Sequence, residues 1–156
     1  SKKLIFLEYG QSVSESKRYI SDLGLEKAVC WFPKMYRKDL MPGLFMCDLV
    51  CAEFVHSWIA GGVIFEALVA GKPLLSFRDE TLHDESEVRG LYPIYNGKTP
   101  AEIAERLQDY VSDPDRGRQM GKEGQKWYDE HVVSKALLKY GEYFEQRSKE
   151  LGKVAR

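Results

Sequence analysis

The sequence predicts an α/β fold with a doubly wound, mainly parallel sheet flanked by helices. Apolar stretches of strand length alternate along the chain with segments of helical period, and this alternation indicates β-α-β units. Capping residues precede several of the helical segments, and glycines follow them. A length of 156 residues, 44% of them hydrophobic, suits one ordinary core. No repeat or low-complexity linker marks a second domain, so we expect residues 1–156 to form a single domain.

The predicted strands are short apolar runs bounded by turn residues. They cover residues 4–8, 29–32, 49–54, 74–77 and 91–95. Helices are expected over residues 14–23, 37–45, 63–70, 100–112, 116–130 and 133–151. Pro42 would interrupt the second of these helices unless that helix begins near it. Residues 78–89 are polar and are expected to form a loop.

Composition and charge exclude several classes of protein. The formal net charge of −1 lacks the basic excess that binding to a nucleic-acid backbone requires, so we expect a small ligand. The apolar runs fall far short of the roughly 20 residues that span a bilayer. No signal segment opens the chain, and we expect a soluble, cytoplasmic protein. Because the chain begins at Ser1 and runs directly into a strand, we expect a fragment cut at a domain boundary.

The cysteines and histidines do not predict a metal site. Cys30, Cys47 and Cys51 are expected to be buried free thiols, and the three histidines are scattered along the chain. Four-ligand sites need closely spaced pairs of these residues, so we expect no metal and no cofactor. The sequence also lacks a Gly-x-Ser-x-Gly elbow and a Walker phosphate loop, so neither a hydrolase nor a kinase is predicted.

The segment from Ser57 to Pro73 carries the most chemical information. It follows a predicted strand and starts a helix at the pair Gly61-Gly62. Glycine lets the backbone approach a ligand, and the free N–H groups of a helix start carry partial positive charge, so this turn suits a diphosphate. A tight strand-to-helix turn in any doubly wound fold also favours paired glycines, and this structural interpretation stays open.

Glu66 is the only ionisable residue between Val63 and Ala70 on an otherwise apolar helix. A carboxylate in such a place needs polar partners. Helical side chains lean toward the N-terminus of their helix, so Glu66 is expected to point back at the glycine turn, where ribose hydroxyls would donate hydrogen bonds to it. The alternative is a structural Glu66 that neighbouring backbone groups or an arginine satisfies.

The sequence resembles the family 4 retaining glycosyltransferases, which have the GT-B fold. The resemblance rests on the run GGVIFEALVAGKP at residues 61–73. Agreement extends to residues 4–10, 29–33, 48–50, 84–90 and 120–121, so it spans most of the chain from about residue 4 to residue 140. By this resemblance the chain is the C-terminal, Rossmann-like domain of a two-domain enzyme, and the N-terminal acceptor-binding domain is absent.

The resemblance implies roles for individual residues. Glu66 would bind the ribose of a nucleotide-sugar donor, and the backbone N–H groups of Gly61, Gly62 and Val63 would bind its diphosphate. The residues whose main chain would meet the base are Phe32, Pro33, Lys34 and Met35. The implied reaction is hexosyl transfer with retention at the anomeric carbon, in which the enzyme stabilises charge on the departing diphosphate. No catalytic residue is assigned.

The chain departs from the family pattern at two points. Trp58 stands eight residues before Glu66, where the family has an acid that contacts the donor sugar. Trp58 could stack on a sugar ring, His56 or Ser57 could make the polar contacts, or Trp58 could be an ordinary packed tryptophan. The family's basic pair, an arginine and a lysine that neutralise the diphosphate, would lie upstream of Leu4 and is absent from this chain.

Other charged and aromatic residues have both a functional and a structural interpretation. A basic group that is either ligand-binding or solvated surface consists of Lys34, Arg37 and Lys38. The resemblance places Glu85 or Glu87 near the donor sugar; otherwise these residues and Asp84 are charges of a loop. Late aromatics that are expected in the core, or on a face that packs on the absent domain, are Trp127, Tyr128, Tyr140, Tyr143 and Phe144.

We therefore expect the donor-binding half of a glycosyltransferase that acts on a polysaccharide, a glycolipid or a related acceptor. The fragment alone is expected to be inactive. The alternative is a non-catalytic nucleotide- or sugar-binding domain with the same fold, which Trp58 at an acidic position would suit. The expected partners are the nucleotide-sugar donor and the absent N-terminal domain, and any contact with a membrane would be made through that absent domain.

Overall fold

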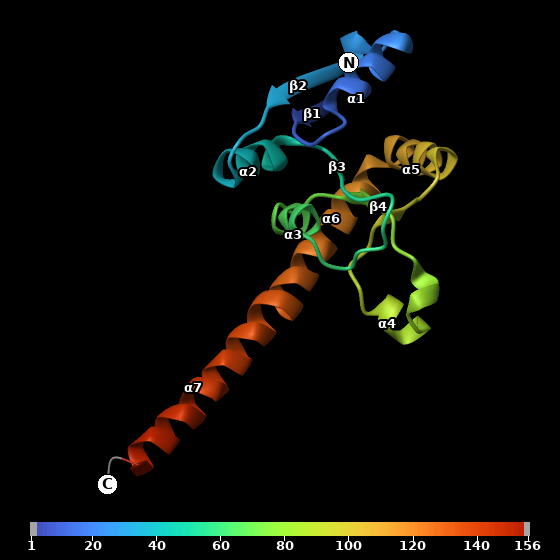
Figure 1. Cartoon of the computed structure of the whole chain (residues 1–156). Helices are drawn as coiled ribbons and strands as arrows, with labels where there is room; N and C mark the ends of the chain where they lie inside the picture. Colours follow the sequence, from blue (N-terminus) through green and yellow to red (C-terminus); the bar gives the residue numbers. More distant parts are fainter. Residues whose placement is uncertain (1–2, 155–156) are drawn as a thin grey trace. The chain divides into compact units, whose positions relative to one another are not determined.

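The computed structural model describes residues 3–154 of the chain. The chain divides into two compact units, and the division falls between Leu40 and Met41. The helices and strands, shown in Figure 1, are β1 (Leu4–Glu8), α1 (Val13–Asp22), β2 (Val29–Pro33), α2 (Arg37–Met46), β3 (Val50–Cys51), α3 (Gly62–Val69), β4 (Leu74–Ser76), α4 (Glu85–Arg89), β5 (Tyr95–Asn96), α5 (Pro100–Ser112), α6 (Pro114–Tyr128) and α7 (Lys135–Val154). Within residues 3–154, no helix has both the length and the hydrophobicity that crossing a bilayer requires.

The first unit contains a β-α-β arrangement. Its strands β1 and β2 run parallel, in a register that pairs Leu4 with Val29 and Glu8 with Pro33. The helix α1 lies between them in the sequence and is followed by Gly24, whose φ of 67° is the left-handed conformation that favours glycine. The order β1, α1, β2 is the one that the sequence predicts, and the structure adds a 3₁₀ turn (Glu26–Ala28) before β2.

The second unit is built around β4, which lies between β3 and β5 in a parallel three-stranded sheet. All three residues of β4 are buried, and Leu75 is completely inaccessible. Helices α3 and α5 contact β4, and α5 also contacts β5. Helix-flanked parallel sheets confirm the predicted α/β class, although the strands form two sheets, one in each unit.

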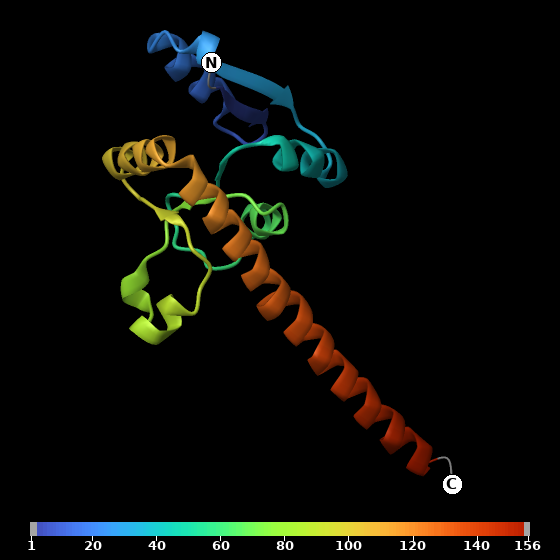
Figure 2. The same cartoon turned by 180° about the vertical axis from the view of Figure 1, so that it is seen from behind.

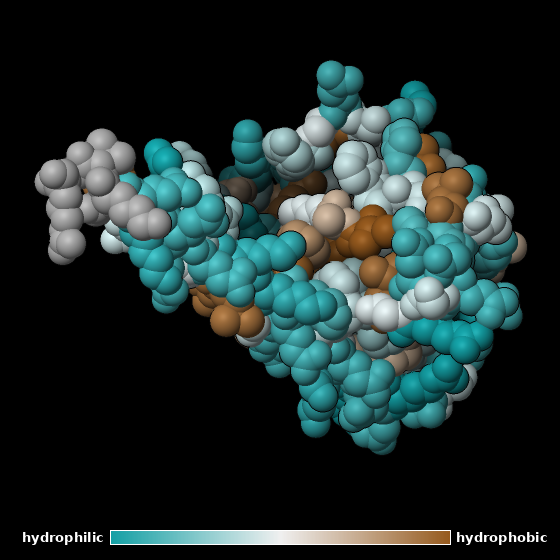
Figure 3. All heavy atoms as spheres, turned by 90° about the horizontal axis from the view of Figure 1, so that it is seen from below, coloured by the Kyte–Doolittle hydropathy of each residue, from teal (hydrophilic) through white to brown (hydrophobic). Residues whose placement is uncertain are grey.

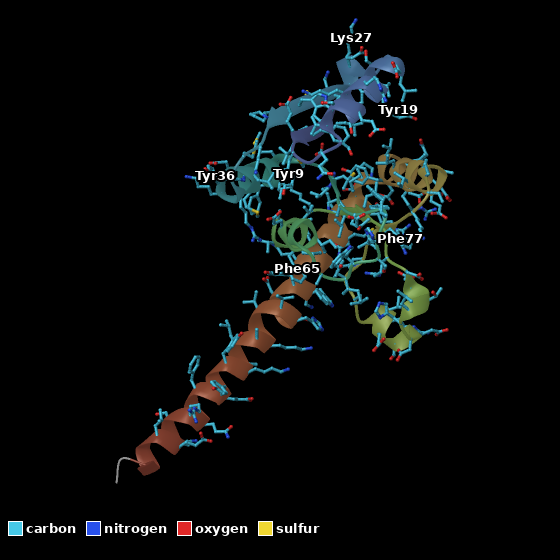
Figure 4. All side chains as sticks on the ribbon, viewed as in Figure 1. Tyr9, Tyr19, Lys27, Tyr36, Phe65 and Phe77 are labelled. Carbon is cyan, nitrogen blue, oxygen red and sulfur yellow. The ribbon has the colours of Figure 1, made fainter. Side chains whose placement is uncertain are left out.

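Helix α6 packs closely against α3, and the two lie side by side in Figure 1 and Figure 2. A Cβ atom at Gly124 of α6 would lie only 2.7 Å from Cδ2 of Leu68 on α3, so a larger residue there would force the Leu68 side chain to move. The ring of Phe65 meets Tyr128 edge-to-face with the ring centroids 5.3 Å apart. Figure 4 labels Phe65 on α3, close to α6.

Two of the predicted strands are much shorter in the structure, and the strand expected over residues 74–77 ends one residue early, at Ser76. The strand expected over residues 49–54 is assigned only at Val50–Cys51, although its hydrogen bonds to β4 continue as far as the carbonyl oxygen of Glu53. The strand expected over residues 91–95 begins only at Tyr95. Pro93 has no N–H to donate to a ladder, and the preceding residues make other contacts.

The polar stretch over residues 78–89 is not the plain loop that we expect from the sequence. It contains a 3₁₀ turn (Glu80–Leu82) and the short helix α4. The side chain of Asp84 accepts hydrogen bonds from the backbone N–H groups of Ser86 and Glu87, and Glu87 accepts one from Asp84 in return. This reciprocal capping box supplies local hydrogen bonds that a search for apolar periodicity does not detect.

The C-terminal helices are continuous where the sequence predicts a break. A π-helical turn (Asp129–Ser134) joins α6 to α7.

Helix α2 begins at Arg37 and contains Pro42 within it, instead of beginning near that proline. Proline removes one hydrogen bond from a helix but does not prevent residues before it from adopting helical angles when other contacts stabilise them.

Several expectations about burial are corrected. Tyr140, Tyr143 and Phe144 are exposed, so they are not core residues; Figure 3 shows hydrophobic side chains beside hydrophilic ones along the segment that ends at the grey C-terminus. Trp127 and Tyr128 are half-buried. The cysteines are free, but Cys30 and Cys47 are only partly buried and Cys51 is exposed, because Cys51 alternates with the buried Val50 along β3.

Candidate functional site

The candidate site of the second unit begins with the turn before α3. Gly61 precedes the helix with an extended backbone (φ −173°, ψ 163°), and no side chain caps the helix start. A Cβ atom at Gly62 would meet nothing within 4 Å, so the space beside this residue is open. A helix start with uncapped N–H groups and open space beside it is suited to an anionic ligand.

Glu66 lies on α3 one turn after these glycines and is 6% exposed. Gly62 and Val63 precede it by four and three residues, which places all three on one face of the helix. An ionised carboxylate with so little solvent contact depends on polar partners. Glu66 therefore lies buried on the helix that the sequence predicts, and its role in binding ribose stays a prediction.

Glu53, at the end of the β3 ladder, organises the loop that leads to α3. One oxygen of its carboxylate accepts hydrogen bonds from the N–H groups of Val55 (2.7 Å) and His56 (3.3 Å). These backbone donors hold the pKa of the Glu53 carboxyl below its usual value. The sequence analysis missed Glu53 because it falls inside a predicted strand; an acid at the end of a strand, just before a loop, was the available signal.

The three residues predicted to contact the donor sugar lie consecutively in this loop. His56 is exposed, and its Nδ1 atom is 4.0 Å from the Glu53 carboxylate. The Ser57 hydroxyl accepts a hydrogen bond of 2.8 Å from the N–H of Asp79, so it already has a structural partner. Trp58 is 53% exposed, and its role stays a prediction.

Arg78 is a buried cation that the sequence analysis assigns to a loop. Its side chain donates to the carbonyl oxygen of Tyr92 (3.0 Å) and to the Glu80 carboxylate (3.0 Å). The centre of its guanidinium group lies 5.5 Å from the centroid of the Tyr92 ring. Asn96 fixes the backbone of Arg78 by accepting from its N–H and donating to its carbonyl oxygen. No sequence pattern marks this cluster, since its members come from separate segments.

The acidic residues after β4 are used mainly by α4. Asp84 and Glu87 form the capping box, and Glu85 pairs with Arg89 at 2.7 Å on the exposed side of the helix. The Ser86 hydroxyl and the backbone N–H groups of the first turn lower the pKa of Asp84. A contact of Glu85 or Glu87 with the donor sugar stays a prediction.

The residues predicted to meet the base belong to the first unit. Residues 32–35 contain the end of β2 and the first residues of the irregular segment that follows it. Lys34 places its Nζ atom 5.1 Å from the ring centroid of Tyr9, which follows β1; Tyr9 is labelled in Figure 4. The carboxyl ends of two neighbouring parallel strands are thus linked, at the edge where α/β proteins bind ligands.

Across the described part of the chain, no group of three or more His, Cys, Asp or Glu residues is placed so that it could hold a metal ion.

Comparison with known proteins gives no match to a protein family and none to a curated protein sequence. Solved structures do match. The structure of Anabaena HepE in complex with UDP has a TM-score of 0.72 and 21% identity, over 93% of this chain and 41% of HepE. Sucrose-phosphate synthase from Thermosynechococcus elongatus has a TM-score of 0.71 and 14% identity, over 95% of this chain and 39% of the synthase.

A third similar structure is S. aureus TarM, in complex with Fondaparinux, alpha-GlcNAc-glycerol and UDP. Its TM-score is 0.62 at 18% identity, over 88% of this chain and 27% of TarM. The chain therefore spans about two fifths or less of these proteins. All three are GT-B glycosyltransferases, and the likeness confirms the α/β, Rossmann-like fold.

Proposed function

We propose that this chain binds the nucleotide-sugar donor of a retaining, family 4-like GT-B glycosyltransferase, and that the nucleotide is a uridine diphosphate. The observation that carries the proposal is the start of α3, where uncapped N–H groups and open space at Gly62 lie one turn before the buried Glu66. The HepE structures hold UDP or UDP-glucose in a protein that shares this fold.

In this proposal the parts of the donor are bound by different groups. The N–H groups of Gly61, Gly62 and Val63 bind the diphosphate, because a helix start favours anions without any metal. The Glu66 carboxylate accepts hydrogen bonds from the ribose hydroxyls. A role of the main chain of residues 32–35 in meeting the base stays an expectation from the family resemblance.

The donor sugar is assigned to the loop before α3. Trp58 is exposed there and offers a flat apolar surface on which a sugar ring can stack. His56 is also exposed and can donate a hydrogen bond, whereas the Ser57 hydroxyl is engaged with Asp79. We therefore assign the sugar contact to Trp58 and His56 before Ser57.

The proposal extends to the whole protein. An N-terminal domain would bind a polysaccharide, a glycolipid or a related acceptor and complete the active site, and the transfer would retain the anomeric configuration. No metal or other cofactor is required, and the location is cytoplasmic. A second candidate is a binding domain without turnover, which the exposed Trp58 at the family's acidic position favours.

The test is a titration of the full chain with UDP, GDP and ADP, followed by thermal unfolding and calorimetry. A ligand that binds only the folded state raises stability by RT ln(1 + [L]/Kd), and UDP is expected to give the largest shift. The matched variants are Gly62→Asp and Gly141→Asp, both at positions where a Cβ meets nothing within 4 Å.

An acid at position 62 suits a helix start but repels a diphosphate, so Gly62→Asp is expected to lose about tenfold or more in UDP affinity with its stability kept. Gly141→Asp, on α7, is expected to bind UDP as the wild type does. Equal affinity of both variants for UDP would rule out diphosphate binding at the start of α3.

A further inference from the structure

We propose that Tyr92 and Arg78 are positioning residues that hold residues 57–61 in place and so set the position of the first turn of α3. The inference rests on the proposed function for its effect on ligand binding. Its structural part stands on contacts between three segments of the second unit: the loop before α3, the residues that follow β4, and the residues that precede β5.

The first tie is a hydrogen bond from Tyr92 to the loop. The Tyr92 hydroxyl donates to the carbonyl oxygen of Ile59 at 2.5 Å, two residues before Gly61. Tyr92 is almost fully buried, and burial raises the pKa of its phenol. The phenol therefore keeps its proton across the physiological pH range and remains a donor to Ile59.

Arg78 fixes Tyr92 in turn. Its guanidinium group donates to the carbonyl oxygen of Tyr92 and lies over the ring of the same residue, so both the backbone and the ring of Tyr92 are held. The ring of Trp127 also packs edge-to-face against the Tyr92 ring, with the two centroids 4.9 Å apart. The ring has little freedom to move its hydroxyl away from Ile59.

The second tie is a hydrogen bond between the residues that follow β4 and the loop before α3. The N–H of Asp79, next to Arg78, donates to the Ser57 hydroxyl at 2.8 Å. Ser57 is thus attached by a hydrogen bond to Asp79, which follows β4, and Ile59 is attached to the buried Tyr92. Both residues lie on the approach to a glycine pair that has no side chain of its own to pack. An anion site made of backbone N–H groups depends on such external support for its geometry.

The burial of Arg78 favours a role in orienting Tyr92 over a role in stabilising the fold. Among the described residues, the Nε atom of Arg78 is buried without a hydrogen-bond partner, and its only ion pair is with Glu80, whose side chain is 45% exposed. A buried guanidinium with an unmet donor is a costly way to stabilise a fold. Its benefit here is the fixed orientation of Tyr92.

The decisive variant is Tyr92→Phe, which removes only the hydroxyl. The matched control is Tyr110→Phe, because the Tyr110 hydroxyl also donates to a backbone carbonyl, that of Asp48 at 3.2 Å, and its ring also meets another aromatic ring edge-to-face. Each full-length variant is measured by amide hydrogen exchange, by titration with UDP and with uridine, and by urea unfolding.

For Tyr92→Phe we expect exchange to rise by about tenfold at the amides of residues 58–63 and to stay unchanged in α5 and α6. UDP affinity is expected to fall by about two- to tenfold, with uridine affinity unchanged, because uridine lacks the diphosphate. Tyr110→Phe is expected to leave both the exchange of residues 58–63 and the UDP affinity as in the wild type.

Three results would overturn the inference: unchanged exchange at residues 58–63, exchange that rises equally throughout the second unit, or equal losses of UDP and uridine affinity. If the wild-type chain binds no UDP, the proposed function fails, and the exchange data still decide whether Tyr92 holds the loop. If Tyr92→Phe does not fold, Ser57→Ala removes the second tie and is measured in the same way, with the same expected pattern.

Discussion

Gly121 of α6 lies directly against the backbone of Gly71, which follows the C-cap residue of α3. A Cβ atom at Gly121 would overlap the carbonyl oxygen of Gly71 and would lie 2.9 Å from its carbonyl carbon. Gly71 itself has a φ of 64°, a backbone conformation that residues other than glycine rarely adopt. Two glycines, one required by close approach and one by backbone conformation, therefore bring α6 onto the helix that carries Glu66.

The first prediction concerns this contact. Gly121→Ala is expected to lower the free energy of unfolding by about 1–3 kcal/mol, because backbone atoms must move to admit the methyl group. Gly141→Ala is the control: it is also helical, its Cβ meets nothing, and it is expected to raise stability by about 0.5–1 kcal/mol through helix propensity. Urea unfolding measures both, and a Gly121→Ala variant as stable as Gly141→Ala would contradict the packing.

The second prediction concerns Glu66, which we expect to serve the ligand. Glu66→Gln keeps the shape of the side chain but replaces a charged acceptor by a neutral one, so UDP affinity should fall by about five- to thirtyfold, or roughly 1–2 kcal/mol. Calorimetric titration measures the affinity, and urea unfolding of the same variant measures stability. A loss of stability with unchanged UDP affinity would assign Glu66 to the fold instead of the ribose.

The third prediction concerns metal removal. UDP binding to the full chain is expected to persist in EDTA with less than about a threefold change in Kd, because helix N–H groups compensate phosphate charge without an ion. The titration is done in EDTA and again with added magnesium or manganese. Binding that is seen only with a divalent cation would show that the phosphate site includes a metal.

The fourth prediction concerns pH and Glu53. Its folded-state pKa is lowered by the N–H groups of Val55 and His56, so its contribution to stability is present above the ordinary pKa of a glutamate and is lost as the pH falls through the lowered value. Wild type should therefore be more stable than Glu53→Gln at neutral pH, and the difference should shrink in acid. Urea unfolding of both proteins from neutral pH to about pH 3 tests this; a difference that is constant with pH would exclude it.

The fifth prediction concerns turnover. The isolated chain is expected to transfer no sugar from UDP-glucose to an acceptor, because the proposed function assigns acceptor binding to an N-terminal domain. Release of UDP with and without candidate acceptors measures this. Activity above the uncatalysed rate would show that the chain is a complete enzyme, and the proposed dependence on an N-terminal domain would be wrong.

Local signals in the sequence determined much of the fold. Alternating apolar runs predicted β1, α1 and β2 almost to the residue, and the helix expected from residue 100 begins there, after a capping box formed by Thr99 and Glu102. These features depend on residues within one or two turns of each other, so short-range rules are sufficient to find them. The position of the Gly61-Gly62 turn before Glu66 was found for the same reason.

The tertiary structure decided which polar side chains act together. Arg78, Tyr92 and Ile59 are far apart in the sequence, and only the parallel order of β3, β4 and β5 brings their segments together. The exposure of Trp58, and the engagement of Ser57 by Asp79, also depend on this packing. Hydrogen bonds between distant segments form because burial leaves polar groups no water to bind, and no local pattern of residue types encodes which partner each group will find.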